Sequence, residues 1–149
     1  ASMRKKILIM CIIAIMVAAI AVVSADSGDD HDSIGVKYNV PTGYTFNQKN
    51  IVINSDHVTY VKTGVSYSYL RGSDEVVITI FDLVDPSYTL DDVKKDVRPG
   101  YEEITINGID GFYYDESPSV YFDFVKDGKY IYIKAPDKAT LEEILSGTA

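Results

Sequence analysis

A hairpin near the C-terminal end constrains the fold of this chain more than any other segment. Two runs rich in aromatic and β-branched residues, 120–126 and 129–134, flank the dipeptide Asp127-Gly128. Residue composition of this kind is typical of β-strands. Asp-Gly supplies the positive φ angles that a two-residue type I′ turn requires, so the segment predicts a tight antiparallel hairpin.

The register of this hairpin divides its side chains between two faces. A two-residue loop places Phe122 opposite Ile133 and Phe124 opposite Ile131. We expect these four apolar side chains to lie in the core, because they share one face. The other face then carries three aromatic rings, those of Tyr121, Tyr130 and Tyr132.

Alternating apolar and polar residues predict further strands over much of the remaining chain. A second hairpin is expected to turn at Asn107-Gly108, with a bulge at Asp110-Gly111. The segment 75–83 is apolar on both faces, which suits a central strand covered by a helix. The other expected strands are 36–40, 51–54, 57–62, 65–70, 103–106 and 112–114.

Two helices are expected among these strands. Thr89 is a predicted N-cap for residues 90–97, and Thr140 with Glu143 forms a predicted capping box for a helix near the C-terminus. Together the patterns predict an α+β domain with an antiparallel, hairpin-rich sheet, one central helix and one C-terminal helix.

The N-terminal segment predicts delivery across a membrane. Arg4-Lys5-Lys6 precedes an apolar run at 7–23, and small residues come before Asp26. This pattern is typical of a secretory signal, although the run is also near the length of a membrane-spanning helix. A cleaved signal peptide and a retained anchor, both within residues 1–25, therefore stay open, with Ala1-Ser2 interpreted as a cloning scar.

In either case we expect the rest of the chain to be secreted or membrane-anchored outside the cytoplasm, with membrane contact only through residues 7–23. Residues 26–35 are predicted to form an acidic flexible tether, and residues 36–146 a single domain.

Charge and cysteine content exclude several classes of function. Residues 1–25 hold three basic and no acidic residues, so residues 26–149 carry 11 basic and 22 acidic residues and a formal charge of −11. Such a domain repels nucleic-acid phosphates and anionic lipid headgroups. The one cysteine, Cys11, lies in the apolar run. We therefore expect no nucleic-acid partner and no disulfide in the domain.

Catalytic and metal-binding patterns in this chain are weak. The tether sequence DSGDDHDS departs from a calcium loop at two ligand positions and lacks the closing bidentate acid. His31 lies in that tether, and His57 adjoins Ser55-Asp56 without the separated segments that build a triad. Asp115-Glu116 are sequence neighbours, which does not imply the spacing of a glycosidase pair. We expect no catalytic residue, metal site or cofactor.

The tyrosines are the most suggestive side chains for binding. All 12 lie beyond residue 25, in a chain with no tryptophan. A tyrosine joins a broad apolar ring to a polar tip, which suits recognition of sugars or peptides in water. We predict a ligand-binding face at Tyr121, Tyr130 and Tyr132; the alternative is that these rings only pack across strands.

Three functions are compatible with these features. The first is a non-enzymatic envelope module for binding, adhesion or assembly, with an envelope polysaccharide or a protein as its partner. The second is a structural subunit of a membrane complex or filament. The third is a hydrolase of envelope polymers that acts through carboxylates, which requires two carboxylates from different strands in one cleft.

The order of motifs also resembles a known architecture. The segment Val40-Pro41-x-Gly43-Tyr44, the helix opening at Thr89-Leu90, the hairpins at 104–108 and 120–134, and the helix at 140–145 follow the order seen in PsbP/Mog1-like α/β/α sandwich domains. The C-terminal third is also similar to small secreted domains of unknown function from archaea and Gram-positive bacteria. The resemblance implies a binding or assembly module and transfers no catalytic residue.

Overall fold

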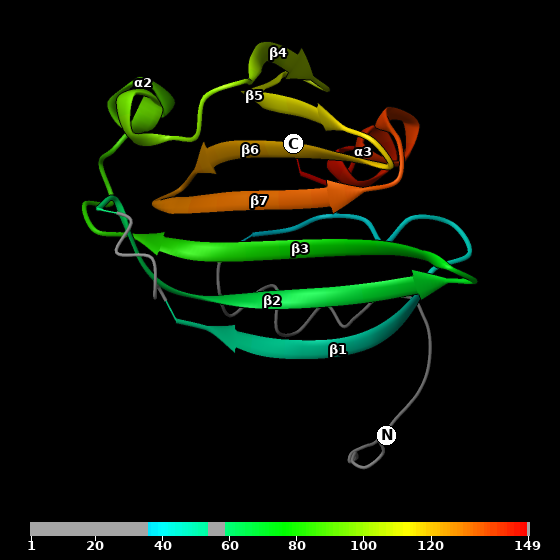
Figure 1. Ribbon diagram of the computed structural model, residues 1–149. Helices are drawn as coiled ribbons and strands as arrows, with labels where there is room; N and C mark the ends of the chain where they lie inside the picture. Colours follow the sequence, from blue (N-terminus) through cyan, green and yellow to red (C-terminus); the bar gives the residue numbers. More distant parts are fainter. Residues whose placement is uncertain (1–35, 54–58, 149) are drawn as a thin grey trace.

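A computed structural model describes residues 36–53 and 59–148 of the chain, which form one seven-stranded antiparallel sheet and two short helices (Figure 1). The strand order across the sheet is β1-β2-β3-β7-β6-β5-β4. The elements in chain order are β1 (Thr45–Val52), β2 (Val61–Arg71), β3 (Asp74–Leu83), α2 (Leu90–Val93), the 3₁₀ turn η2 (Lys94–Asp96), β4 (Glu102–Ile106), β5 (Ile109–Glu116), β6 (Ser119–Lys126), β7 (Lys129–Ala135) and α3 (Lys138–Leu145).

Two consecutive meanders build this sheet. Strands β1 to β3 form the first, and β4 to β7 form the second in reverse order, so that β7 returns to pair with β3. The segment containing α2 and η2 makes the long connection from β3 to the far edge at β4. The expected α+β class with an antiparallel, hairpin-rich sheet is therefore confirmed.

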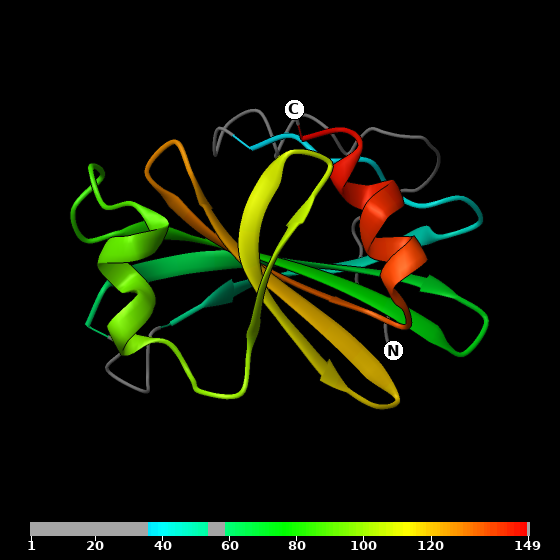
Figure 2. The same cartoon turned by 90° about the horizontal axis from the view of Figure 1, so that it is seen from above.

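The two helices lie on opposite faces of the sheet (Figure 2). α3 covers the larger core, where Leu141 and Ile144 pack with inward side chains of β2, β3, β6 and β7. The chain from residue 36 to residue 44 lies on the same side, since the backbone N–H of Asn39 donates to the backbone carbonyl of Ile144 at 3.0 Å. α2 and η2 cover part of the other face.

The C-terminal hairpin has the predicted turn and register. Asp127 and Gly128 take positive φ angles of 51° and 80°, as a two-residue turn requires. Phe122 pairs with Ile133 and Phe124 with Ile131. None of these four side chains exposes more than 1% of its surface, so the predicted core face is confirmed.

The prediction of a bulge at Asp110-Gly111 is wrong, although the predicted turn at Asn107-Gly108 is present. β4 and β5 pair without a register shift from Ile106↔Ile109 to Glu102↔Tyr113. Gly111 serves packing instead, because a Cβ atom there would lie 2.5 Å from the Asp123 carbonyl oxygen and would overlap the Phe122 ring. The glycine is needed for close approach of β5 to β6.

The predictions for the N-terminal strands were also wrong in part. Residues 36–40 form no strand, because this segment packs on α3 instead of pairing with the sheet. The first strand, Thr45–Val52, replaces the predicted strand at 51–54, and the second starts at Val61. Short apolar runs do not identify their pairing partners, so strand boundaries here depended on tertiary contacts. His57 lies outside the described residues.

The predicted N-cap is correct for one of the two helices and wrong for the other. Thr89 caps α2 in a capping box with Asp92, as predicted for this start site, with Asp92 as its acid. α3 begins earlier than predicted, with Asp137 rather than Thr140 as its N-cap. The backbone amide and hydroxyl of Thr140 donate to the Asp137 carboxylate at 2.8 and 2.7 Å.

Residues 1–35 are outside the described part of the chain, so the signal or anchor segment and the acidic tether stay predictions. Within residues 36–53 and 59–148, no helix has the length and apolar character needed to cross a membrane.

Candidate functional site

The candidate site lies on the sheet face opposite α3, which is only partly covered. At one end of this face Val93 of α2 and Val97 pack with Tyr60 over a small second core that contains Phe112 and Tyr114. The rest of the face is open toward the viewer in Figure 1, because no described helix crosses it.

All three tyrosines of the predicted site point to this face, but they differ in accessibility. Tyr121 and Tyr132 are half-buried, and their ring centroids lie 5.7 Å apart at an interplanar angle of 42°. Tyr130 is only 4% exposed, since its ring packs against Tyr60 at 5.1 Å in the second core. Two of the three rings are therefore available to a ligand, and the third supports them from within.

Asp123 is a buried polar group on the same face, beside these rings. It pairs with Tyr132 across the strands and is 6% exposed. The Tyr130 hydroxyl donates to Asp123 Oδ2 at 2.6 Å, whereas Oδ1 has no hydrogen-bond partner among the described residues. Burial raises the pKa of Asp123 to about 7, against the opposing effect of the Tyr130 hydrogen bond and the Arg98 charge.

The sequence patterns do not single out this carboxyl as a candidate site residue. The sequence contains one signal that could have indicated it: Asp123 is the only acid inside the apolar and aromatic run of β6. An acid at the centre of such a strand is either exposed at an open face or buried with a partner. Its pKa near 7 lets it change charge in the neutral pH range, which few carboxyls do.

Arg98 lies at the covered end of the site. Its guanidinium lies 4.0 Å from the centre of the Tyr114 ring and pairs with Glu116. The Tyr114 hydroxyl donates to the Arg98 backbone carbonyl at 2.7 Å, which holds this segment against β5. Burial raises the pKa values of Tyr114 and Tyr132 to about 12, so both hydroxyls stay protonated and can donate hydrogen bonds near neutral pH.

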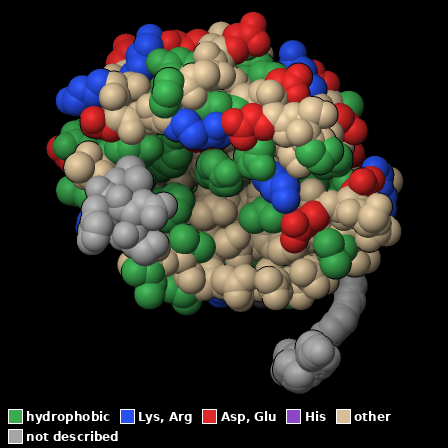
Figure 3. Space-filling model, in the orientation of Figure 1, with side chains coloured by type: hydrophobic (Ala, Val, Ile, Leu, Met, Phe, Trp, Pro, Cys, Tyr) green, Lys and Arg blue, Asp and Glu red, His purple; other side chains and the backbone are tan. Residues whose placement is uncertain are grey.

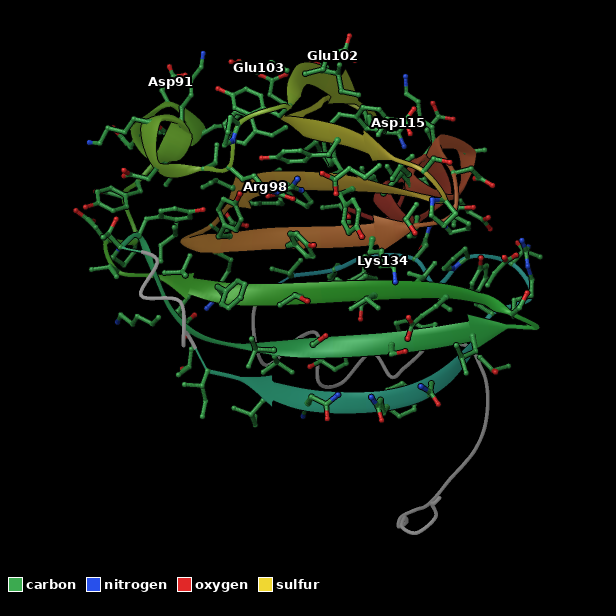
Figure 4. The ribbon with its side chains drawn as sticks, viewed as in Figure 1. Asp91, Arg98, Glu102, Glu103, Asp115 and Lys134 are labelled. Atoms are coloured by element: carbon green, nitrogen blue, oxygen red, sulfur yellow. The ribbon has the colours of Figure 1, made fainter. Side chains whose placement is uncertain are left out.

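A band of polar side chains continues from the tyrosines toward β1. Lys134, directly opposite Tyr121, is 3.5 Å from the Glu75 carboxylate. The Ser68 hydroxyl donates to Glu75 at 2.9 Å, and the Asn47 amide donates to Ser68 at 3.3 Å. Figure 4 labels Arg98 near β6 and Lys134 near the junction of β7 and β3, so two cations from different elements belong to this face.

The surface of this face is uneven in charge and shape. Figure 3 shows it hollowed near its centre, with most charged side chains above the hollow and mainly uncharged atoms below it. The geometry offers aromatic rings, amides, hydroxyls and paired charges over a shallow surface. Such a combination suits contact with a polar ligand that has flat apolar faces, rather than enclosure of a small apolar molecule.

A separate acidic hollow lies between α2 and the β4–β5 hairpin. Its volume is about 410 Å³, and Asp91 and Glu103 lie on its two sides (Figure 4). Glu103 pairs with Lys94, and Asp110 accepts a hydrogen bond from Thr105 at 2.6 Å. Two of its acids therefore have partners, and the hollow does not present a pair of free carboxylates for acid–base chemistry.

The remaining weak candidates from the sequence do not assemble into a site. Asp115 and Glu116 are both exposed and adjacent on β5, so their side chains point to opposite faces, and Glu116 pairs with Arg98. His31 and the Ser55-Asp56-His57 segment lie outside the described residues. In the described part of the chain, no three His, Cys, Asp or Glu side chains are grouped to hold a metal ion.

Comparison with known proteins provides no relative from which a role could be transferred. No protein-family model, curated protein or solved structure matches this chain. The resemblance to PsbP/Mog1-like domains therefore stays a sequence-based prediction, and the function has to be inferred from the site itself.

Proposed function

We propose that this chain is a non-enzymatic binding domain that is displayed outside the cytoplasm. Its ligand is a polar, ring-containing polymer, of which an envelope polysaccharide is the simplest case. Tyr121 and Tyr132 are the proposed contact residues, with Tyr130 as the buried support. The extracytoplasmic location rests on the signal-like pattern of residues 1–25.

One observation carries this proposal: two half-exposed tyrosine rings lie side by side on this sheet face, next to a band of polar side chains. The ring centroids of Tyr121 and Tyr132 are 5.7 Å apart, so together they form one aromatic surface. Sugar rings present C–H groups that stack on such surfaces and hydroxyls that pair with amides and charged groups beside them. The band from Lys134 to Asn47 supplies those polar groups.

The raised pKa of Asp123 is the one observation that favours the alternative of a carboxylate hydrolase. Glycoside hydrolysis needs a second carboxyl within roughly 5–10 Å, on the other side of the scissile bond. The hydrogen-bond partner of Asp123 is Tyr130, and burial leaves the carboxyl little access to a substrate. We therefore prefer a binding role.

Affinity electrophoresis tests this proposal directly. The protein is run in native gels that contain soluble neutral or uronic-acid polysaccharides, and retardation is measured against polysaccharide concentration. We expect Tyr132→Ala to weaken binding about tenfold, which corresponds to about 1.4 kcal/mol for one lost aromatic contact. The matched control is Tyr113→Ala, since Tyr113 is also half-buried but pairs with Phe122 on the opposite face.

Equal retardation of Tyr132→Ala, Tyr113→Ala and the unmodified chain would remove the tyrosine face from the proposal. Release of reducing sugars during incubation, abolished by Asp123→Asn, would instead support the hydrolase.

A further inference from the structure

The edge strand β1 has features that the proposed binding face does not explain. It is eight residues long, and no described strand pairs with its outer edge (Figure 1). Phe46 and Ile51 on this strand are 58% and 69% exposed, and Ile53 directly after it is 72% exposed. A long edge strand with exposed apolar side chains can pair with another strand through the backbone groups on its outer side.

The two edges of the sheet differ in charge. From residue 36 to residue 73 the chain has four basic residues, and Asp56 is its one acid. The hairpin at the other edge, residues 102–116, has five acids and no basic residue. In a domain with a formal charge of −11, two copies repel each other least where their β1 edges meet.

We propose that β1 is an interface that pairs with β1 of a second copy of this chain, so that two sheets join into one. A two-fold axis normal to the sheet makes the two β1 strands antiparallel, which is the more stable pairing. The surface is then self-complementary, as a closed dimer requires. Phe46 and Ile51 of each copy come next to the β1 strand of the other and lose exposed surface.

The alternative pairing of β1 with β4 of another copy is less favourable despite its opposite charges. Every neighbouring pair in the sheet is antiparallel, so β1 and β4 point in the same direction within one molecule. Copies related by translation would thus join β1 to β4 in parallel, over only the five residues of β4. Such head-to-tail contacts also leave open ends instead of a closed dimer.

The two-fold arrangement also fits the direction from which the N-terminal segment enters. Residues 36–44 lie on the α3 side of the sheet, where the Thr148 hydroxyl donates to the Lys37 carbonyl at 2.9 Å. An axis normal to the sheet keeps the α3 sides of both copies together. Residue 36 of both copies therefore lies on the same side of the joined sheet, which is compatible with attachment of two predicted N-terminal anchors to a single membrane, and both tyrosine faces lie on the other side.

Disulfide trapping in the full chain tests this interface without any ligand. Cysteine replaces Gln48, Lys49 or Asn50, one at a time, in a Cys11→Ser background, and the protein in phospholipid vesicles is oxidised with copper phenanthroline. At the residue on the axis, the Cα atoms of the two copies lie about 4.5–5.5 Å apart, within disulfide range. For a residue next to the axis position, the equivalent residue of the other copy is displaced by about 7 Å along the strand.

We expect one of the three positions to convert most of the protein to dimer, with several-fold less dimer at the other two. Thr105→Cys on the exposed edge β4 is the matched control and should give little dimer. Adding Ile51→Lys should reduce trapping at the preferred position at least tenfold and leave the far-UV circular dichroism spectrum unchanged, because Ile51 is 69% exposed within one copy.

Trapping no greater than at Thr105, or equal trapping at all three β1 positions, would overturn the proposal. So would disulfides formed between Asn50→Cys chains and Thr105→Cys chains in a mixture, since these report the head-to-tail contact.

Discussion

Asp123 shows how one residue couples the core to the candidate site. It lies directly across the strands from Tyr132 of the half-exposed ring pair, and its hydrogen bond to Tyr130 links it to the second core. An aspartate that is buried in its charged form destabilises the fold, whereas the protonated form does not have this cost. The residue therefore makes stability depend on pH in the neutral range.

The first prediction concerns this dependence. The pKa of Asp123 rises to about 7 on folding, from about 4 in the unfolded chain. Between these values the folded chain holds a proton that the unfolded chain has lost, so stability falls as pH rises from about 4 to about 7 and then levels off. The loss is about 4 kcal/mol for three pKa units.

Asp123→Asn should remove this slope, because asparagine keeps an acceptor for the Tyr130 hydroxyl and has no charge. Urea unfolding at pH 5, 6, 7 and 8 measures the effect. Hydrogen bonds in the folded chain favour the charged forms of Asp85, Asp92 and Asp137 and so lower their pKa values. These three groups therefore change the stability only at acidic pH, below this window. Parallel pH profiles for the variant and the unmodified protein would contradict the prediction.

The second prediction concerns Gly111, whose missing side chain makes room for the Phe122 ring. Gly111→Ala should destabilise the domain by about 1–3 kcal/mol, because an added methyl group forces a shift of the ring or of β6. Chemical denaturation measures this loss. Ser119→Ala, at a half-buried position of β6, is the control and should change stability by no more than about 0.5 kcal/mol.

At the scale of elements, local sequence patterns predicted the turns better than the residues at which strands and helices begin and end. Asp127-Gly128 and Asn107-Gly108 form the expected turns, since two-residue hairpin loops depend on positive φ angles that few residues adopt. The start of α3 depends on a competition between two polar side chains. Asp137 precedes Thr140 and accepts both of its hydrogen bonds, so the helix starts one turn earlier.

A third prediction tests the cap of α3. Asp137→Ala should destabilise the domain by about 1 kcal/mol, because the Thr140 amide loses its acceptor at the N-terminal end of the helix. Asp137→Asn, which keeps an acceptor, is the conservative control and should lose much less. Thermal unfolding followed by circular dichroism separates them; equal losses for the two variants would show that charge, not capping, stabilises this end.

At the scale of the whole molecule, the sheet separates three features. α3 and residues 36–44 occupy one face, the tyrosine surface and its polar band occupy the other, and the two edges differ in charge and length. Binding and self-association are therefore assigned to different surfaces. The polar band of the binding face reaches Asn47 on β1, but the tests of Tyr132 and of β1 can fail independently, because they substitute different residues.

Local sequence patterns alone determined the hairpins, the α+β class and the grouping of Tyr121, Tyr130 and Tyr132 on one face. These features follow from turn chemistry and from the two-residue period of a strand, which act over a few residues. A pattern of this kind assigns a side chain to a face, but it contains no information on what covers that face.

Tertiary structure alone decided which members of that face are accessible. Tyr130 is buried because Tyr60, distant in sequence, packs on it, whereas no described element crosses the rings of Tyr121 and Tyr132. The raised pKa of Asp123 has the same origin, since desolvation depends on neighbours from β5, β7 and the segments around Tyr60 and Arg98. The position of β1 at the edge of the described sheet likewise follows from strand order, which requires contacts between residues far apart in the chain.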